Sequence, residues 1–101
     1  MGIFDRLRGG TVRIHILIKG RIGDGWRDID EHVRVPTGTT LGELLEITDS
    51  ANIPLRDALT HSPHLTETMM LNGERCPITD NAGRVLAEGD EIYLLAPLAG
   101  G

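Results

Sequence analysis

The sequence is poor in cysteine and aromatic residues and has no long apolar run, and each of these features excludes a class of protein. Cys76 is the only cysteine among 101 residues, so an internal disulfide cannot form and a reducing compartment is expected. A single Phe, Trp and Tyr leave Val, Ile, Leu and Met to build the core. No apolar run approaches the ~20 residues that cross a bilayer, and the opening MGIFDRLRGG is too polar for a signal peptide. We therefore expect one cytoplasmic domain.

The sequence also lacks an excess of basic residues and any complete catalytic or metal-binding motif. Ten Lys and Arg stand against fifteen Asp and Glu, which gives a formal net charge of −5 and argues against nucleic acid or an anionic membrane as partner. His61 and His64 flank Pro63 with no cysteine nearby, so we expect no metal site there. Cys76 is expected to be a packing residue. We therefore expect a protein that is not an enzyme and binds no cofactor of its own.

Alternating apolar residues predict three main strands. The first strand has β-branched residues at every second position, which is typical of a strand with one buried face. These residues are Val12, Ile14, Ile16 and Ile18. A glycine-rich hairpin loop is expected over 20–28, followed by a second strand over 29–35 that stops at Pro36. The last strand is expected over 91–96, and Asn72-Gly73 predicts a tight turn between two short strands.

The best helix is predicted within residues 37–53. Thr40 followed by Glu43 fits a capping box, and Leu41, Leu44 and Leu45 share one helix face. Residues 54–67 are expected to form an irregular connection with at most one short helical turn.

The order of these elements predicts an α+β protein of the β-grasp type. Strand, strand, helix, short strands and strand do not alternate regularly, which argues against a doubly wound sheet. We expect a mixed sheet of four or five strands packed on one main helix, with the last strand beside the first. The predicted organisation is an N-terminal arm over 1–10, a β-grasp domain over 11–97 and a flexible tail over 98–101.

Three segments of the sequence together resemble a known family. They are VRVPTGTTLGELLE, MMLNGE and LAEGDEIYLLAPLAGG. The family is that of the ubiquitin-like sulfur carriers, namely the small subunit of molybdopterin synthase and the sulfur carrier of thiamine biosynthesis. In order, the three segments resemble the family's second strand with its proline turn and helix start, its hairpin, and its closing strand with a terminal diglycine.

The resemblance implies chemistry at the carboxylate of Gly101. In the family, an E1-like adenylating enzyme uses ATP to activate this carboxylate, and a sulfur donor then displaces AMP to leave a thiocarboxylate. Gly100 and Gly101 would be the working residues, since glycine passes a narrow channel and adopts backbone angles that other residues cannot. Pro97 would fix the direction in which the tail leaves the domain.

A partner-binding surface is predicted beside the tail. If the even-numbered residues of the first strand face the helix, Leu17 points outward, and Tyr93 and Leu95 do so from the last strand. Together with Pro97 and Leu98 they would form an exposed apolar patch of the kind that often binds partners. Glu88, Asp90 and Glu91 would guide a basic partner toward it.

Three other functions stay open at this point. The chain could be the small subunit of molybdopterin synthase, with its tail inserted into a large synthase subunit. It could be a ubiquitin-like protein modifier that is joined to lysine through Gly101. It could also be a non-catalytic β-grasp interaction module, for which the diglycine would have no role.

Overall fold

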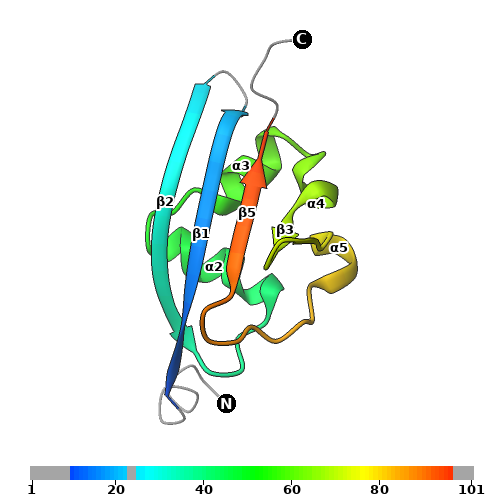
Figure 1. Cartoon of the computed structure of the whole chain (residues 1–101). Coiled ribbons are helices and arrows are strands. Elements are labelled where there is room, and N and C mark those ends of the chain that lie inside the picture. Colours follow the sequence, from blue (N-terminus) through cyan, green and yellow to red (C-terminus); the bar gives the residue numbers. More distant parts are fainter. Residues whose placement is uncertain (1–9, 23–24, 97–101) are drawn as a thin grey trace.

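Two long strands form one side of the sheet in the computed structural model, which describes residues 10–22 and 25–96 (Figure 1). β1 (Thr11–Ile22) pairs antiparallel with β2 (Gly25–Pro36), in an unbroken register from Thr11 opposite Pro36 to Ile22 opposite Gly25. The expected hairpin loop over 20–28 was therefore too wide, because both strands continue through most of it. The glycines in this stretch suggested a loop, but Gly20 and Gly25 belong to the two strands.

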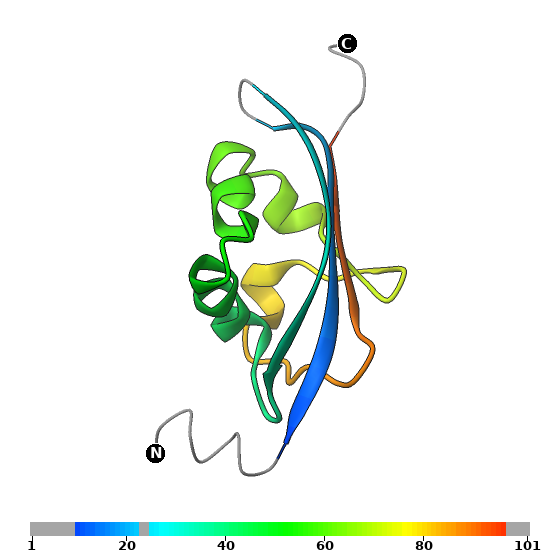
Figure 2. The same cartoon turned by 90° about the vertical axis from the view of Figure 1, so that its left-hand side faces the viewer.

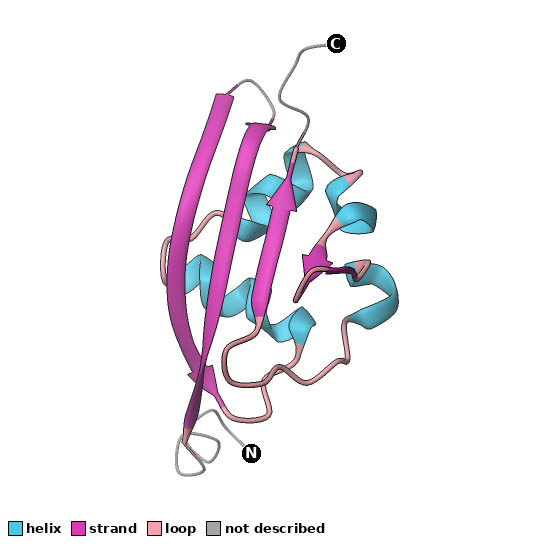
Figure 3. Cartoon of the chain, in the orientation of Figure 1, coloured by secondary structure: helices cyan, strands magenta, loops and turns pink. Residues whose placement is uncertain are grey.

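The last strand lies in the middle of the sheet. β5 (Glu91–Leu95) runs parallel to β1 on one side and antiparallel to β3 (Met70–Leu71) on the other, and β3 pairs with β4 (Glu74–Arg75). The order across the five-stranded sheet is β2-β1-β5-β3-β4 (Figure 3). The predicted position of the last strand beside the first is confirmed.

The hairpin between β3 and β4 turns at Asn72-Gly73, as predicted. Both residues have positive φ, at 54° and 84°, which is the backbone that a type I′ turn requires. The twist of a type I′ turn matches the twist of the flanking strands, so two residues are enough to connect β3 and β4.

The main helix, α2 (Leu41–Ser50), begins with the capping box that the sequence predicts. The Glu43 amide donates to Thr40 Oγ1 at 3.2 Å, and the Thr40 amide donates to Glu43 Oε1 at 3.0 Å. Leu41, Leu44 and Thr48 are its buried residues. Asn52 follows the helix end with φ 61°, a left-handed conformation that asparagine tolerates better than most residues.

Three short helices complete the helical layer and correct the prediction for residues 54–67. α3 (Leu55–His61) confirms and lengthens the short helical turn expected in this stretch. α4 (Leu65–Thr68) replaces part of the expected irregular connection, and α5 (Ile78–Asn81) follows β4. Pro63 hid α4, because proline marks a break in a sequence pattern but here comes just before the start of a helix. All the helices of the described residues lie on one face of the sheet (Figure 2).

The core lies between this helical layer and the inner face of the sheet. Ile14, Ile16 and Ile18 of β1 and Ile92 and Leu94 of β5 are completely buried. The helical layer adds four more completely buried side chains. These are Leu41, Leu44, Leu55 and Leu65. The mixed sheet with its helices on one face is a β-grasp fold of the ubiquitin-like type, as the sequence predicted.

Candidate functional site

The outer face of the sheet holds the predicted apolar residues side by side. Leu17 of β1 lies opposite Tyr93 of β5, and both are half-buried. Leu95 follows on the same face, is 53% exposed and lies opposite Lys19. The register therefore brings Leu17, Tyr93 and Leu95 together as the alternation of the two strands predicted.

Met70 belongs to the same surface and was missed in the sequence. It lies opposite Tyr93 on the β3 side, so Tyr93 has apolar neighbours on both flanking strands. The signal that could have found it is the central place of β5, which requires a strand on each side. We refer to Leu17, Met70, Tyr93 and Leu95 as the outer patch.

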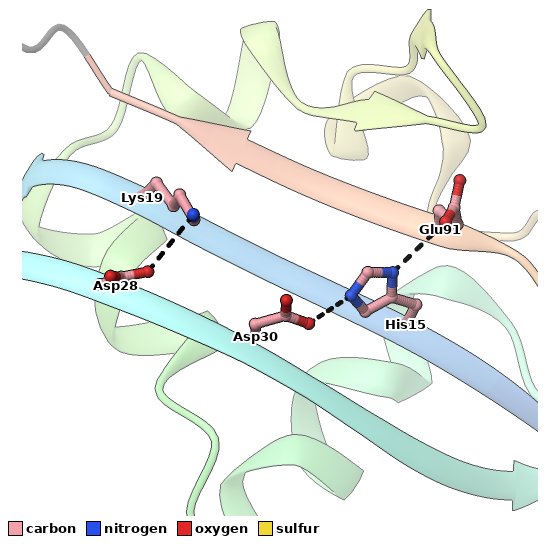
Figure 4. A network of polar contacts seen from close by, with 5 residues as sticks. All are labelled: His15, Lys19, Asp28, Asp30 and Glu91. Carbon is pink, nitrogen blue, oxygen red and sulfur yellow. Dashed lines mark hydrogen bonds and ion pairs between the residues drawn. The ribbon is translucent and has the colours of Figure 1, made fainter.

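A polar cluster continues this face toward the start of β5 (Figure 4). His15 Nε2 lies 2.5 Å from Asp30 Oδ1, and His15 Nδ1 lies 3.4 Å from Glu91 Oε2. The imidazole of His15 also stacks on that of His32, with the ring centres 4.4 Å apart. It meets the Tyr93 ring edge-on, with the ring centres 6.0 Å apart. His15 thus links three strands, because its two ring nitrogens reach carboxylates on β2 and β5.

The two carboxylates favour the protonated form of this histidine. The hydrogen bond to Asp30 raises the pKa of His15 above its ordinary value of 6.5, Glu91 adds to the rise, and partial burial opposes it. Loss of solvent and then the charge of Glu91 raise the pKa of Tyr93 above 10.0, so this phenol stays neutral at physiological pH. Protonated, His15 donates from both nitrogens and neutralises part of the surrounding negative charge.

The end of β5 is fixed against β1 just before the tail. The Ala96 amide donates to the Lys19 carbonyl at 2.8 Å, and Ala96 is 5% exposed. Gly20 has φ +117°, and a Cβ built on it would lie 2.6 Å from the Ala96 carbonyl oxygen and 2.8 Å from the Ala96 Cβ. Only glycine at this position allows β1 to approach Ala96 so closely. The chain is thereby held in the sheet up to the residue that precedes Pro97.

Four predicted site residues lie outside the described part of the chain. They are Pro97, Leu98, Gly100 and Gly101. The predicted arm over 1–10 lies outside it as well, except for Gly10. Their roles therefore stay predictions.

The acidic turn before β5 differs from the expected cluster of guiding charges. Asp90 is only 8% exposed, and its carboxylate accepts from Asn72 Nδ2 at 2.9 Å and from the Ala87 amide at 2.8 Å. Glu88 accepts from the Arg13 amide at 3.0 Å. The prediction for Asp90 was wrong, since its charge is used inside the fold to fix the turn.

The remaining candidate residues do not gather into a site. Cys76 is 3% exposed and packs in the core. His61 contacts Asp57 of its own helix, at 3.1 Å between Nδ1 and Oδ1. Within the described residues, no group of three or more His, Cys, Asp or Glu side chains is placed to hold a metal ion. No helix in the same part of the chain is long and apolar enough to cross a membrane.

Comparison with known proteins supports the fold and goes no further. No protein-family model matches the chain, and a search of curated proteins finds no significant relative. Among solved structures, the HVO 2177 protein of Haloferax volcanii overlaps with a TM-score of 0.55 and 17% identity, over 91% of this chain and 89% of that one. The ubiquitin of Caldiarchaeum subterraneum overlaps with a TM-score of 0.45 and 18% identity, over 91% and 100% of the two chains. The Haloferax protein shares the fold, and the weaker overlap adds no further argument.

Proposed function

We propose that this protein is a sulfur carrier whose Gly101 carboxylate is activated by an E1-like adenylating enzyme and converted to a thiocarboxylate. One observation carries the proposal: β5 is held in the middle of the sheet up to Ala96, and five residues ending in Gly-Gly follow it in the sequence. The fold thus supplies a fixed base for a short segment whose last two residues carry no side chain, and another protein's active site could receive it.

The chemistry needs a partner because a carboxylate is a poor acyl donor. ATP converts the Gly101 carboxylate to an acyl adenylate with release of pyrophosphate. Hydrosulfide, the simplest sulfur donor, then attacks the carbonyl carbon, the bond to the phosphate oxygen breaks, and AMP leaves. The product is a thiocarboxylate, with no change in the oxidation state of carbon or sulfur. No described residue of this chain is required as acid, base or nucleophile.

The outer patch supports the docking step. Leu17, Met70 and Tyr93 occupy adjacent strands, and Leu95 lies near the point where the chain leaves the sheet. An apolar surface that reaches the end of β5 would let the partner bind the domain and receive the tail at the same time.

Pyrophosphate release provides the test of activation. The full chain is mixed with the ubiquitin-activating-type enzyme of its own genome and with ATP, and pyrophosphate formation is followed. We expect release that depends on this chain and is lost when Gly101 is deleted. Release that persists unchanged after the deletion would contradict the proposal. The intact mass of the purified protein shows whether Gly101 is its last residue, as the proposal requires.

The three alternatives separate by product. A small subunit of molybdopterin synthase forms the same thiocarboxylate and also a stable complex with a large synthase subunit. A protein modifier forms heavier conjugates through lysine. A plain interaction module binds its partner equally well with and without Gly101.

A further inference from the structure

β2 presents an unusually long free edge. Among the described residues, β1 is its only strand partner, and its other edge pairs with no strand. The edge is twelve residues long, roughly twice the typical length of a strand. A long edge with unpaired N–H and C=O groups is a ready template for another strand.

The hydrogen-bond pattern identifies which residues offer these groups. The His15 amide donates to Asp90, and the Lys19 carbonyl accepts from Ala96, so both residues direct their backbone groups away from β2. In an antiparallel pair, residues opposite such positions also turn their groups away from the partner strand. The residues opposite them, His32 and Asp28, therefore present N–H and C=O to the free edge, and the alternation adds Asp30 and Arg34.

The side chains of these same four residues form a self-complementary series. Along the outer face of β2 the order is Asp28, Asp30, His32 and Arg34, two acidic residues followed by two basic ones. Reversed, the order becomes basic, basic, acidic, acidic. Two such strands running antiparallel, with Glu31 opposite itself, place Asp28 opposite Arg34 and Asp30 opposite His32. A two-fold axis repeats each pair, which gives four complementary contacts.

We propose that two copies of this chain associate through the free edges of β2, in the antiparallel register that places Glu31 on the two-fold axis. The two sheets become one continuous sheet, and the interface is isologous. This inference rests on β2 alone and is independent of the proposed sulfur chemistry.

Neighbouring registers fit the charges less well. A shift of two residues in one direction places Asp30 opposite Asp30 of the second copy. The same shift in the other direction places His32 opposite His32 and leaves Asp28 opposite Pro36, which carries no charge. The register centred on Glu31 is the one that places each of the two aspartates of the outer face opposite an arginine or a histidine.

The inner face of the proposed interface is apolar on both sides of the axis. Ile29 would lie opposite Val33 of the second copy, and both residues line a groove of about 230 Å³ between β2 and the connection that contains Ile53 and Pro54. Glu31 on the axis is the unfavourable contact, because like charges directly opposite each other destabilise a strand pair. Glu31→Gln should therefore tighten the association severalfold.

Sedimentation of the full chain over a wide concentration range tests the association. We expect the mass to rise from 11.0 kDa toward twice that value as concentration increases, and to fall again with added salt. A mass that stays at the monomer value up to millimolar concentration overturns the proposal.

A charge-exchange experiment tests the register. Asp28→Arg alone places two arginines opposite each other, and Arg34→Asp alone places two aspartates opposite each other, so each single variant should raise the dimer dissociation constant roughly tenfold or more. An equimolar mixture of the two variants restores both pairs and should form a heterodimer. The double variant should associate as the original chain does.

Matched controls keep the result interpretable. Glu74→Arg reverses an exposed charge on β4, at the opposite edge of the sheet, and should leave the association unchanged. Circular dichroism of each variant verifies the fold, since Asp28 also contacts Lys19 at 3.6 Å. Single variants that dimerise as well as the original chain, or a folded mixture that stays monomeric, would overturn the register.

Discussion

Gly20 and Ala96 touch at a point where no side chain fits between them. A Cβ on Gly20 would lie 2.6 Å from the Ala96 carbonyl oxygen, closer than real Cβ contacts allow, and Gly20 also has a φ of +117°. The contact holds the last described residue of the chain against β1, because the Ala96 amide donates to the neighbouring Lys19 carbonyl. The direction in which the chain leaves the sheet therefore depends on a glycine that lies 76 residues earlier in the sequence.

The first prediction concerns this contact. In Gly20→Ala the positive φ becomes strained and the new Cβ clashes with Ala96, so the free energy of unfolding should fall by about 2 to 4 kcal/mol. Gly89→Ala is the matched control, because Gly89 has φ +83° with nothing within 4 Å of its built Cβ. The difference between the two variants, measured by denaturant unfolding, isolates the contact. Equal losses would show that only the backbone angle matters.

Asp90 is predicted to be structural. Asp90→Ala removes the acceptor of the Asn72 side chain and of the Ala87 amide, so it should cost about 1 to 3 kcal/mol of unfolding free energy. Glu74→Ala, at an exposed acidic residue of β4, should change stability by less than about 0.5 kcal/mol. A destabilisation by Asp90→Ala no larger than that of the control contradicts this assignment.

His15 should make stability depend on pH in a defined direction. Its pKa is raised in the folded state by Asp30 and Glu91, so its contribution is fully present below its ordinary value of 6.5 and is lost as pH rises through the raised value. His15→Gln should therefore destabilise the protein more at mildly acidic pH than at mildly alkaline pH.

The free energy of unfolding of the original chain and of His15→Gln is measured at a pH below 6.5 and at a pH above the raised pKa of His15. His64→Gln, at an exposed histidine next to α4, serves as the control. A stability loss in His15→Gln that is the same at both pH values contradicts the account, whatever its size.

The outer patch is predicted to bind the activating enzyme. Leu95→Asp places a charge where Leu95 is 53% exposed, so it should raise the dissociation constant for the adenylating enzyme about tenfold or more with little effect on folding. Val85→Asp alters a residue that is 58% exposed and lies outside the outer patch. Calorimetric titration that gives equal affinities for the two variants would exclude the outer patch from docking.

The sequence predicted the fold well where a pattern is local. The alternation in 12–18 and 92–96 identified the buried faces of β1 and β5, and Thr40 with Glu43 identified the helix start. Each of these signals is carried by residues only two to four positions apart. Because the buried faces of β1 and β5 and the pairing of these two strands were predicted correctly, Leu17, Tyr93 and Leu95 were also placed correctly on a common surface.

What the sequence missed depends on contacts between distant segments. The bridge from His15 to Asp30 and Glu91 spans three strands, and its register is fixed only when the sheet is assembled. Asp90 looked like a surface charge because its donor Asn72 is eighteen residues away. The missed helices α4 and α5 have four residues each, which is too short for a clear helical period.

The central claim is tested most directly by the intact mass of the protein after reaction. The full chain is incubated with its adenylating enzyme, ATP and sulfide, and the mass is measured with a Gly101 deletion as control. A sulfur carrier gains the mass of one oxygen-to-sulfur exchange, located at Gly101 by fragmentation, and the deletion variant gains nothing. An unchanged mass despite pyrophosphate release, or only heavier lysine conjugates, would contradict the sulfur-carrier account.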